Sequence, residues 1–132
     1  ELKDSKQQEA KDKITLFNQT VRWAELDQIF SEARKIIRWL EKEPPIISRR
    51  FAYNLRIYGE MSQEYERTKK VEYLKFVPLL TYDINRNLTK EEQKEGFEWA
   101  EELMPSKENP KGGQNLPYLK TIMEYVLTYT RS

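Results

Sequence analysis

The chain has 132 residues, of which 34% are charged, but its formal net charge is only +1. It contains no cysteine and no histidine, which excludes disulfides and thiolate chemistry and removes the commonest general base and metal ligand. No apolar run approaches the ~18 residues of a membrane span, and the charged N-terminal residues lack a signal-peptide core. We therefore expect a single domain covering residues 1–132, a cytoplasmic location and no membrane partner.

The charges are unevenly distributed along the chain. Residues 44–90 carry nine cations and five anions, whereas residues 91–104 carry one cation and six anions. The sequence therefore has a basic middle beside an acidic segment. Two interpretations stay open: a charged binding surface, or the ordinary solvated faces of helices.

The first long helix is predicted where apolar residues recur at helical spacing between residues 26 and 40. This stripe consists of Leu26, Ile29, Ala33, Ile36, Ile37 and Leu40. A shorter stripe of Ile14, Phe17 and Val21 precedes it and is offset around the axis. The offset predicts a bend near Trp23 or a separate short helix, and Pro44-Pro45 should end the long one.

The next two helices are predicted from residue 48 to residue 86. Ser48 is the expected N-cap of the first of them, whose core face is Phe51, Leu55, Tyr58, Ser62 and Tyr65. The second, over residues 70–86, contains "VEYLKFVPLLTYDI", which is apolar nearly all round. That composition predicts burial on several sides, with a kink at Pro78.

Two further helices are predicted towards the C-terminus. Thr89 and Glu92 have the spacing of a capping box for a helix that ends near Met104. A surface loop should follow over residues 105–115, and Pro117 fits the first turn of a final helix. The inner face of that helix is Leu119, Ile122, Val126 and Tyr129. The sequence as a whole predicts an all-α, single-domain bundle of about five helices without a sheet.

No catalytic constellation appears in the sequence. No serine lies in a G-x-S-x-G elbow, and "PKGGQN" lacks the Lys-Ser or Lys-Thr of a phosphate loop. The carboxylates mostly alternate with lysines, as in "TKEEQKEGFEWAEE", which is typical of a solvated helix surface. We therefore expect a protein that is not an enzyme and holds neither cofactor nor metal.

Arginines and tyrosines are interleaved in "ISRRFAYNLRIY", residues 47–58. At about 100° per residue, one stripe opposite the apolar face contains Arg49, Tyr53, Arg56, Glu60 and Arg67. On the next helix, Lys75, Leu79, Tyr82 and Arg86 fall on one line. Guanidinium groups bind phosphate and tyrosines stack on bases, so the pattern favours a single-stranded nucleic acid. The alternative is that Arg56 pairs with Glu60 and Arg67 with Glu64 as exposed salt bridges of little consequence.

Three segments resemble a known family. They are "SRRFAYNLRIYGEM", with its serine and nearby cations, "LKFVPLLTYDINR", with a Leu-x-Pro-x-x-x-Tyr-like stretch that closes on arginine, and the aromatic helix "LPYLKTIMEYVLTYTR". On these segments the chain resembles the small subunit of type III-A CRISPR effector (Csm) complexes. The sequence departs from the family pattern at Asn85 and in the loop at residues 105–115.

The resemblance implies an all-helical, non-catalytic subunit of an antiviral ribonucleoprotein. Several copies would line the guide RNA and the target RNA, next to other subunits that carry out cleavage. Carried over by position, the RNA-binding candidates are Arg49, Arg50 and Arg86. The helical-wheel argument alone adds Tyr53, Arg56, Arg67 and Lys75. Expected partners are thus single-stranded RNA, the other effector subunits and further copies of the chain.

A different class of function stays open. A helical adaptor that binds only protein would also explain the apolar stretch at residues 70–86, the many aromatic residues and the charge asymmetry. Both interpretations predict self-association, because a small domain would otherwise leave an apolar face exposed.

Overall fold

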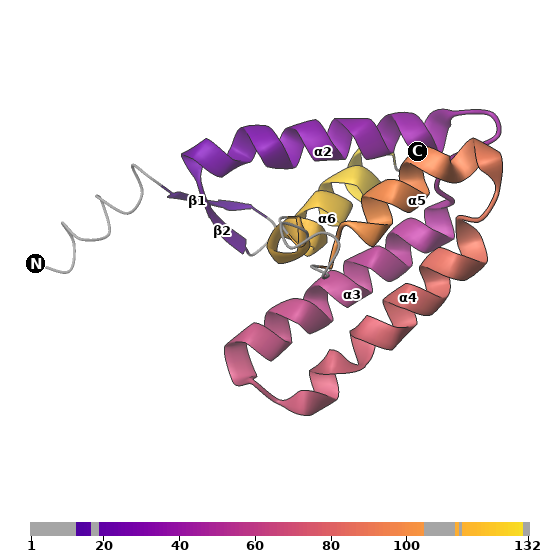
Figure 1. Cartoon of the computed structure of the whole chain (residues 1–132). Coiled ribbons are helices and arrows are strands. Elements are labelled where there is room, and N and C mark those ends of the chain that lie inside the picture. The colour runs from indigo at the N-terminus through magenta and orange to yellow at the C-terminus, as the bar shows by residue number, and fades with distance from the viewer. Residues whose placement is uncertain (1–12, 17–18, 105–112, 114, 131–132) are drawn as a thin grey trace, which may run out of the picture.

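The computed structural model describes residues 13–16, 19–104, 113 and 115–130. In this part of the chain, five α-helices follow a β-hairpin (Figure 1). The helices are α2 (Trp23–Glu41), α3 (Arg49–Thr68), α4 (Phe76–Asn87), α5 (Lys94–Glu101) and α6 (Leu119–Tyr129). Three short 3₁₀ helices are η1 (Val71–Lys75), η2 (Glu91–Gln93) and η3 (Leu116–Tyr118). The predicted all-α bundle of about five helices is confirmed.

The hairpin consists of strands β1 (Lys13–Leu16) and β2 (Gln19–Arg22), which pair antiparallel with Ile14 opposite Val21. The helical stripe predicted here, and the prediction that no sheet would form, are therefore wrong for this segment. Phe17 lies outside the described residues. The physical reason is composition: Ile14, Thr15, Thr20 and Val21 are all β-branched and favour extended backbone.

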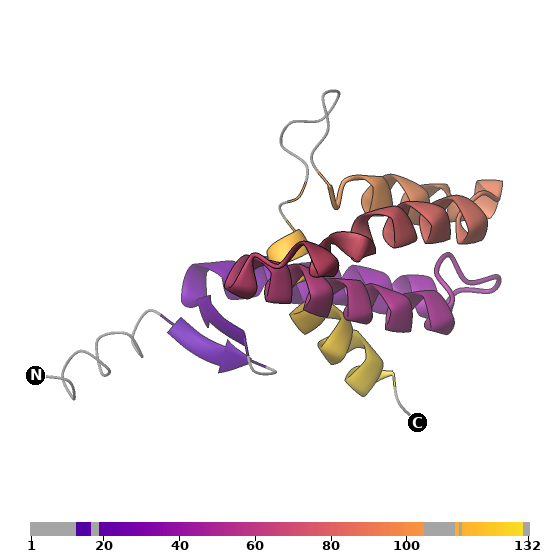
Figure 2. The same ribbon diagram turned by 90° about the horizontal axis from the view of Figure 1, so that it is seen from below.

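Helix α3 lies at the centre of the bundle. It packs against α6 and α4, while α2 packs against α6 and α5 against α4 (Figures 1 and 2). The contact of α3 with α6 is very close at Gly59, where an added Cβ would lie 2.5 Å from the backbone nitrogen of Lys120. A residue without a side chain is needed at that crossing.

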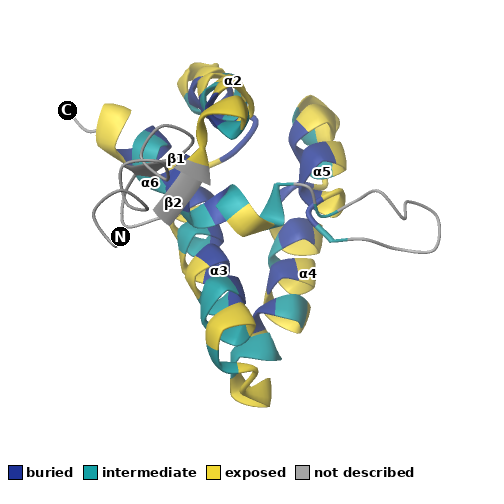
Figure 3. Ribbon diagram, turned by 90° about the vertical axis from the view of Figure 1, so that its left-hand side faces the viewer, coloured by how far each residue is buried: buried dark blue, intermediate teal, exposed yellow. Residues whose placement is uncertain are grey.

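The core is formed where these helices meet, and Figure 3 shows buried residues on their facing sides. Its largest fully buried side chains come from nearly every helix. They are Phe51, Ile29, Ile36, Ile47, Leu55, Leu80, Leu88, Leu103, Leu119, Ile122 and Met123. The predicted stripe of α2 is buried except for Leu40, which is half-buried, as is Tyr65 on the predicted core face of α3.

Two predicted boundaries of α2 and α3 are confirmed. Helix α2 ends at Glu41, before Pro44-Pro45, and the segment that follows is held by a hydrogen bond from the Ile46 amide to the Trp39 carbonyl at 3.0 Å. Ser48 caps α3, because its Oγ accepts a hydrogen bond from the Phe51 amide at 3.1 Å.

The apolar stretch at residues 70–86 differs from its prediction. It divides into η1 and α4, so Pro78 lies in the first turn of α4 rather than at a mid-helix kink. It is also not buried on several sides, because Val71, Leu79 and Tyr82 are 75%, 47% and 57% exposed. The reason is that α4 lies at one side of the bundle, where α3 and α5 cover only part of it.

The two C-terminal helices also show differences. Thr89 and Glu92 do not form a capping box, because η2 begins the segment with Lys90 as its N-cap and no side-chain cap. Tyr129 was predicted to be buried, yet it is 65% exposed. Its ring stacks on Tyr125, which in turn contacts Phe30, so Tyr129 is the outer member of a row of rings. The loop predicted at residues 105–115 falls mostly outside the described residues.

Candidate nucleic-acid interface

A polar cavity of about 380 Å³ lies between α3 and α4. It is lined by Arg50, Phe51, Asn54, Tyr82, Asp83, Arg86 and Asn87. The structure thus brings together two of the predicted arginines, Arg50 on the first turn of α3 and Arg86 on the last turn of α4. Both arginines are exposed, as is the ring of Tyr82.

Asp83 fixes the inner wall of this cavity. Its Oδ2 accepts hydrogen bonds from the Asn54 amide nitrogen at 3.1 Å and from the Tyr58 hydroxyl, both on α3. Burial raises the pKa of Tyr58, and the hydrogen bond to Asp83 raises that pKa further. The hydroxyl therefore remains a donor at neutral pH, and the three side chains join α3 to α4.

Arg86 is positioned by its own helix. Its Nη1 donates to the Tyr82 hydroxyl at 2.7 Å, and the guanidinium carbon lies 5.9 Å from the centre of that ring. Among the described residues, neither Arg50 nor Arg86 forms an ion pair with a carboxylate. Their positive charges are therefore available to an anion from outside the chain.

Arg49 lies on a different side of α3. Its Nη1 donates to the Thr130 hydroxyl at 2.7 Å, and its Nη2 donates to the Leu127 carbonyl at 3.2 Å. The guanidinium also lies 5.7 Å from the ring of Tyr53. A cation at a helix C-terminus is stabilised by the partial negative charge there, so Arg49 belongs to the contact between α3 and α6, whereas Tyr53 is 45% exposed.

The remaining predicted cations are dispersed. Arg56 lies between Glu124 at 3.4 Å and Glu60 at 3.9 Å. Lys75 is exposed where η1 meets α4, and no ion pair with another described residue involves it. The predicted residues therefore do not form one continuous surface, and the pairing of Arg56 with Glu60 allowed by the alternative interpretation is present.

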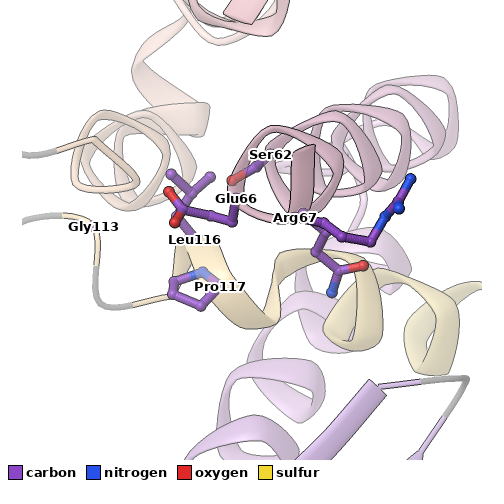
Figure 4. Close-up of a pocket in the computed structure, with 7 residues that line it drawn as sticks. Ser62, Glu66, Arg67, Gly113, Leu116 and Pro117 are labelled. Carbon is purple, nitrogen blue, oxygen red and sulfur yellow. The ribbon is translucent and has the colours of Figure 1, made fainter. Parts of the chain in front are cut away.

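Arg67 lines a second, more apolar pocket of about 690 Å³ at the far end of α3. Figure 4 shows Ser62, Glu66 and Arg67 of α3 on one side of this pocket, and Leu116 and Pro117 on the other. Arg67 pairs with Glu64 at 2.5 Å, as the alternative interpretation also allows. A phosphate at Arg67 would therefore have to compete with a carboxylate.

Sequence reasoning missed three polar residues of the α3–α4 cavity: Asn54, Asp83 and Asn87. A signal was present, since Asn54 is one turn from Arg50 and Asn87 one turn from Asp83. That spacing places each pair on one face of its helix, but it does not tell which helix the face meets.

The described residues contain neither a metal-binding cluster nor a membrane-spanning helix. No three or more of their acidic, histidine or cysteine side chains are grouped so that they could hold a metal ion. None of their helices is both long enough and apolar enough to cross a membrane. Comparison with protein-family models, curated proteins and solved structures gave no match.

Proposed function

We propose that the protein is a non-catalytic, RNA-binding small subunit of a type III-A CRISPR effector complex in the cytoplasm. It contacts guide and target RNA through phosphates, and other subunits carry out cleavage. The proposal rests on the α3–α4 cavity, which is lined by both Arg50 and Arg86 and by the exposed ring of Tyr82. No carboxylate of the described residues forms an ion pair with either arginine. The resemblance of three segments to that family supports the same function.

The chemistry of this surface suits a single strand of RNA. Guanidinium groups bind phosphate through two parallel hydrogen bonds, and an exposed tyrosine offers a stacking platform. Lys75 is the last residue of η1, at the opposite end of α4 from Arg86, and would meet a more distant phosphate of the strand. Phosphate contacts position a strand without reading its bases, so most of the binding energy is independent of sequence. One small subunit makes few contacts, and an array of copies multiplies them.

The test is the salt dependence of RNA affinity in a charge-matched pair of variants. One variant carries Arg50→Ala with Arg86→Ala. The control carries Arg34→Ala with Arg38→Ala, which removes the same charge from two exposed arginines one turn apart on α2. Affinity for a fluorescent single-stranded oligouridylate is measured by polarisation across a salt series, starting at low ionic strength.

The cavity variant is expected to bind more weakly, with a salt slope shallower by ~0.7 for every phosphate of the single strand that it no longer neutralises. The control variant should keep the slope of the parent. Equally weakened binding in the two variants would mean that general charge, and not this cavity, attracts RNA. A parent that binds no RNA even at low salt would overturn the proposal.

A protein-only adaptor is the second candidate, and one observation favours it. Val71 and Leu79 are apolar, yet they are 75% and 47% exposed along η1 and α4. Exposed apolar residues can mark protein contacts, with a further copy of the chain or another effector subunit as the partner. Sedimentation of the parent and of a Val71→Ser, Leu79→Ser variant measures self-association, independently of RNA.

A further inference from the structure

The α3–α4 cavity is lined by two chemically different sets of polar side chains. Arg50 and Arg86 offer only hydrogen-bond donors. The second set offers acceptors, because Asn54 and Asn87 use their amide nitrogens on Asp83: Asn54 donates to Oδ2 at 3.1 Å, and Asn87 to the backbone carbonyl of Asp83 at 2.9 Å. The amide oxygens of both asparagines remain as acceptors.

The carboxylate of Asp83 is held in a defined orientation. Both of its side-chain hydrogen bonds from α3 reach Oδ2, so Oδ1 takes no part in them. The carboxylate shares the cavity with two arginines, yet it forms an ion pair with neither of them within the described residues. A ligand that fits this lining must offer acceptors or an anion to the arginines and donors to the carboxylate.

We infer that the cavity receives a guanine nucleotide, an inference that rests on the proposed RNA-binding function. The Watson–Crick edge of guanine carries two adjacent donors, N1–H and the N2 amino group, and Oδ1 of Asp83 has two lone pairs that can accept them. Its O6 and N7 are a pair of acceptors that guanidinium binds bidentately. Adenine, cytosine and uracil each place an acceptor next to their donor on the Watson–Crick edge, so they leave the carboxylate poorly matched.

The remaining features of the cavity fit the same ligand. The exposed ring of Tyr82 can stack on a purine, and the second arginine is left for the phosphate. The volume of about 380 Å³ is sufficient for a base with its ribose. The phosphate is expected to contact an arginine and not Asp83, because two anions would repel one another. At this one position, binding is therefore expected to depend on the base.

The first experiment changes the ligand and leaves the protein intact. Polarisation at one low salt concentration compares an oligouridylate with the same strand carrying one central guanosine, and with a strand carrying inosine there. Guanosine is expected to tighten binding about tenfold, in the range of one good bidentate base contact. Inosine lacks the N2 amino group, so the strand that carries it should lose most of this increase in affinity.

The second experiment changes the protein. Asp83→Asn replaces the acceptor Oδ1 or Oδ2 with an amide donor at nearly unchanged shape, and should reduce the guanosine-to-uridine affinity ratio to about one. Asp27→Asn, which neutralises an exposed carboxylate on α2, should keep the ratio of the parent. Circular dichroism checks that both variants are folded. If Asp83→Asn does not fold, the strand with inosine still tests the inference.

The outcomes separate this inference from the proposed function. Equal affinities of the parent for all three strands overturn the guanine site and leave phosphate-based RNA binding intact. A parent that binds no strand overturns the proposed function. Direct titration of the parent with free guanosine monophosphate and with uridine monophosphate, by calorimetry, then identifies the source of the nucleotide. Preferential binding of guanosine monophosphate without strand binding supports a site for the free nucleotide, whereas no preference in either assay overturns the site altogether.

Discussion

Trp39 of α2 packs against Trp99 of α5 and so joins the two helices. Their rings meet edge to face, with centroids 6.0 Å apart and an interplanar angle of 78°. Each indole nitrogen donates to a glutamate on the opposite helix: Trp39 to Glu95 at 3.2 Å, and Trp99 to Glu32 at 2.9 Å. The contact thus combines an aromatic pair with two charge-assisted hydrogen bonds.

Replacing Trp99 with phenylalanine should therefore destabilise the fold. The change keeps an aromatic ring but removes the donor to Glu32 and part of the ring contact, at an expected cost of about 1–2 kcal/mol in the free energy of unfolding. Urea denaturation measures it. Trp23→Phe is the matched control, because Trp23 is 50% exposed and its replacement should change stability by less than about 0.5 kcal/mol.

Gly59→Ala should be more harmful than an ordinary glycine replacement in a helix, which usually gains about 0.5–1 kcal/mol. Here the new methyl group would meet the backbone nitrogen of Lys120 at 2.5 Å, so α3 and α6 must separate. We expect a net decrease of roughly 1–3 kcal/mol in the free energy of unfolding. Gly96→Ala meets side-chain carbons of Ile46 and Ile47 instead, at 2.9 and 3.2 Å, and should cost less. An equal or smaller decrease at Gly59 would contradict the close helix crossing.

The adjacent residues Arg49 and Arg50 should have opposite roles. Arg49→Ala removes hydrogen bonds to Thr130 and Leu127 at the end of α6, and should lower the free energy of unfolding by roughly 1 kcal/mol. Arg50→Ala should leave stability nearly unchanged and weaken RNA binding. Thermal denaturation and polarisation on the same two variants measure both effects. The assignment fails if the two variants exchange these effects.

Stability should fall in alkaline solution because of Tyr118. Burial, together with its hydrogen bond to Glu25, raises the pKa of this tyrosine to about 12. An unfolded tyrosine has a pKa near 10, so the folded protein retains a proton that the unfolded chain releases. This contribution to stability is complete below about pH 10 and is lost as the pH rises to about 12. Denaturation between about pH 8 and about pH 11.5 should show the decline, and it should be shallower in Tyr118→Phe.

The helices could be predicted because their apolar residues follow the helical repeat and their ends carry local signals. Ser48 and Pro44-Pro45 are examples, since a cap and a proline act within one turn. Ile14 and Val21 misled the prediction, because a few apolar residues fit a helix and a strand equally well. The exposure of Tyr129 and Leu79 could not be predicted either, since it depends on which neighbouring helices cover each face.

The candidate site could be predicted only in part for the same reason. A helical wheel places Arg49, Tyr53 and Arg56 on one side of α3, but it does not reveal that α6 occupies that side. Arg50 was predicted to bind RNA because of the family resemblance, and not because of its position on the helical wheel. Asp83 was missed because an acidic residue looks unfavourable for RNA binding until it is known to share a cavity with two arginines.

All residues that line the α3–α4 cavity lie between positions 50 and 87, within the continuous stretch formed by α3, η1 and α4. An exchange of this single stretch between related chains would therefore transfer the whole lining. Insertions or deletions in the hairpin, or beyond α4, would leave its lining residues in register. The rest of the chain is thus free to diverge in length and composition, provided that it continues to cover the buried faces of α3 and α4.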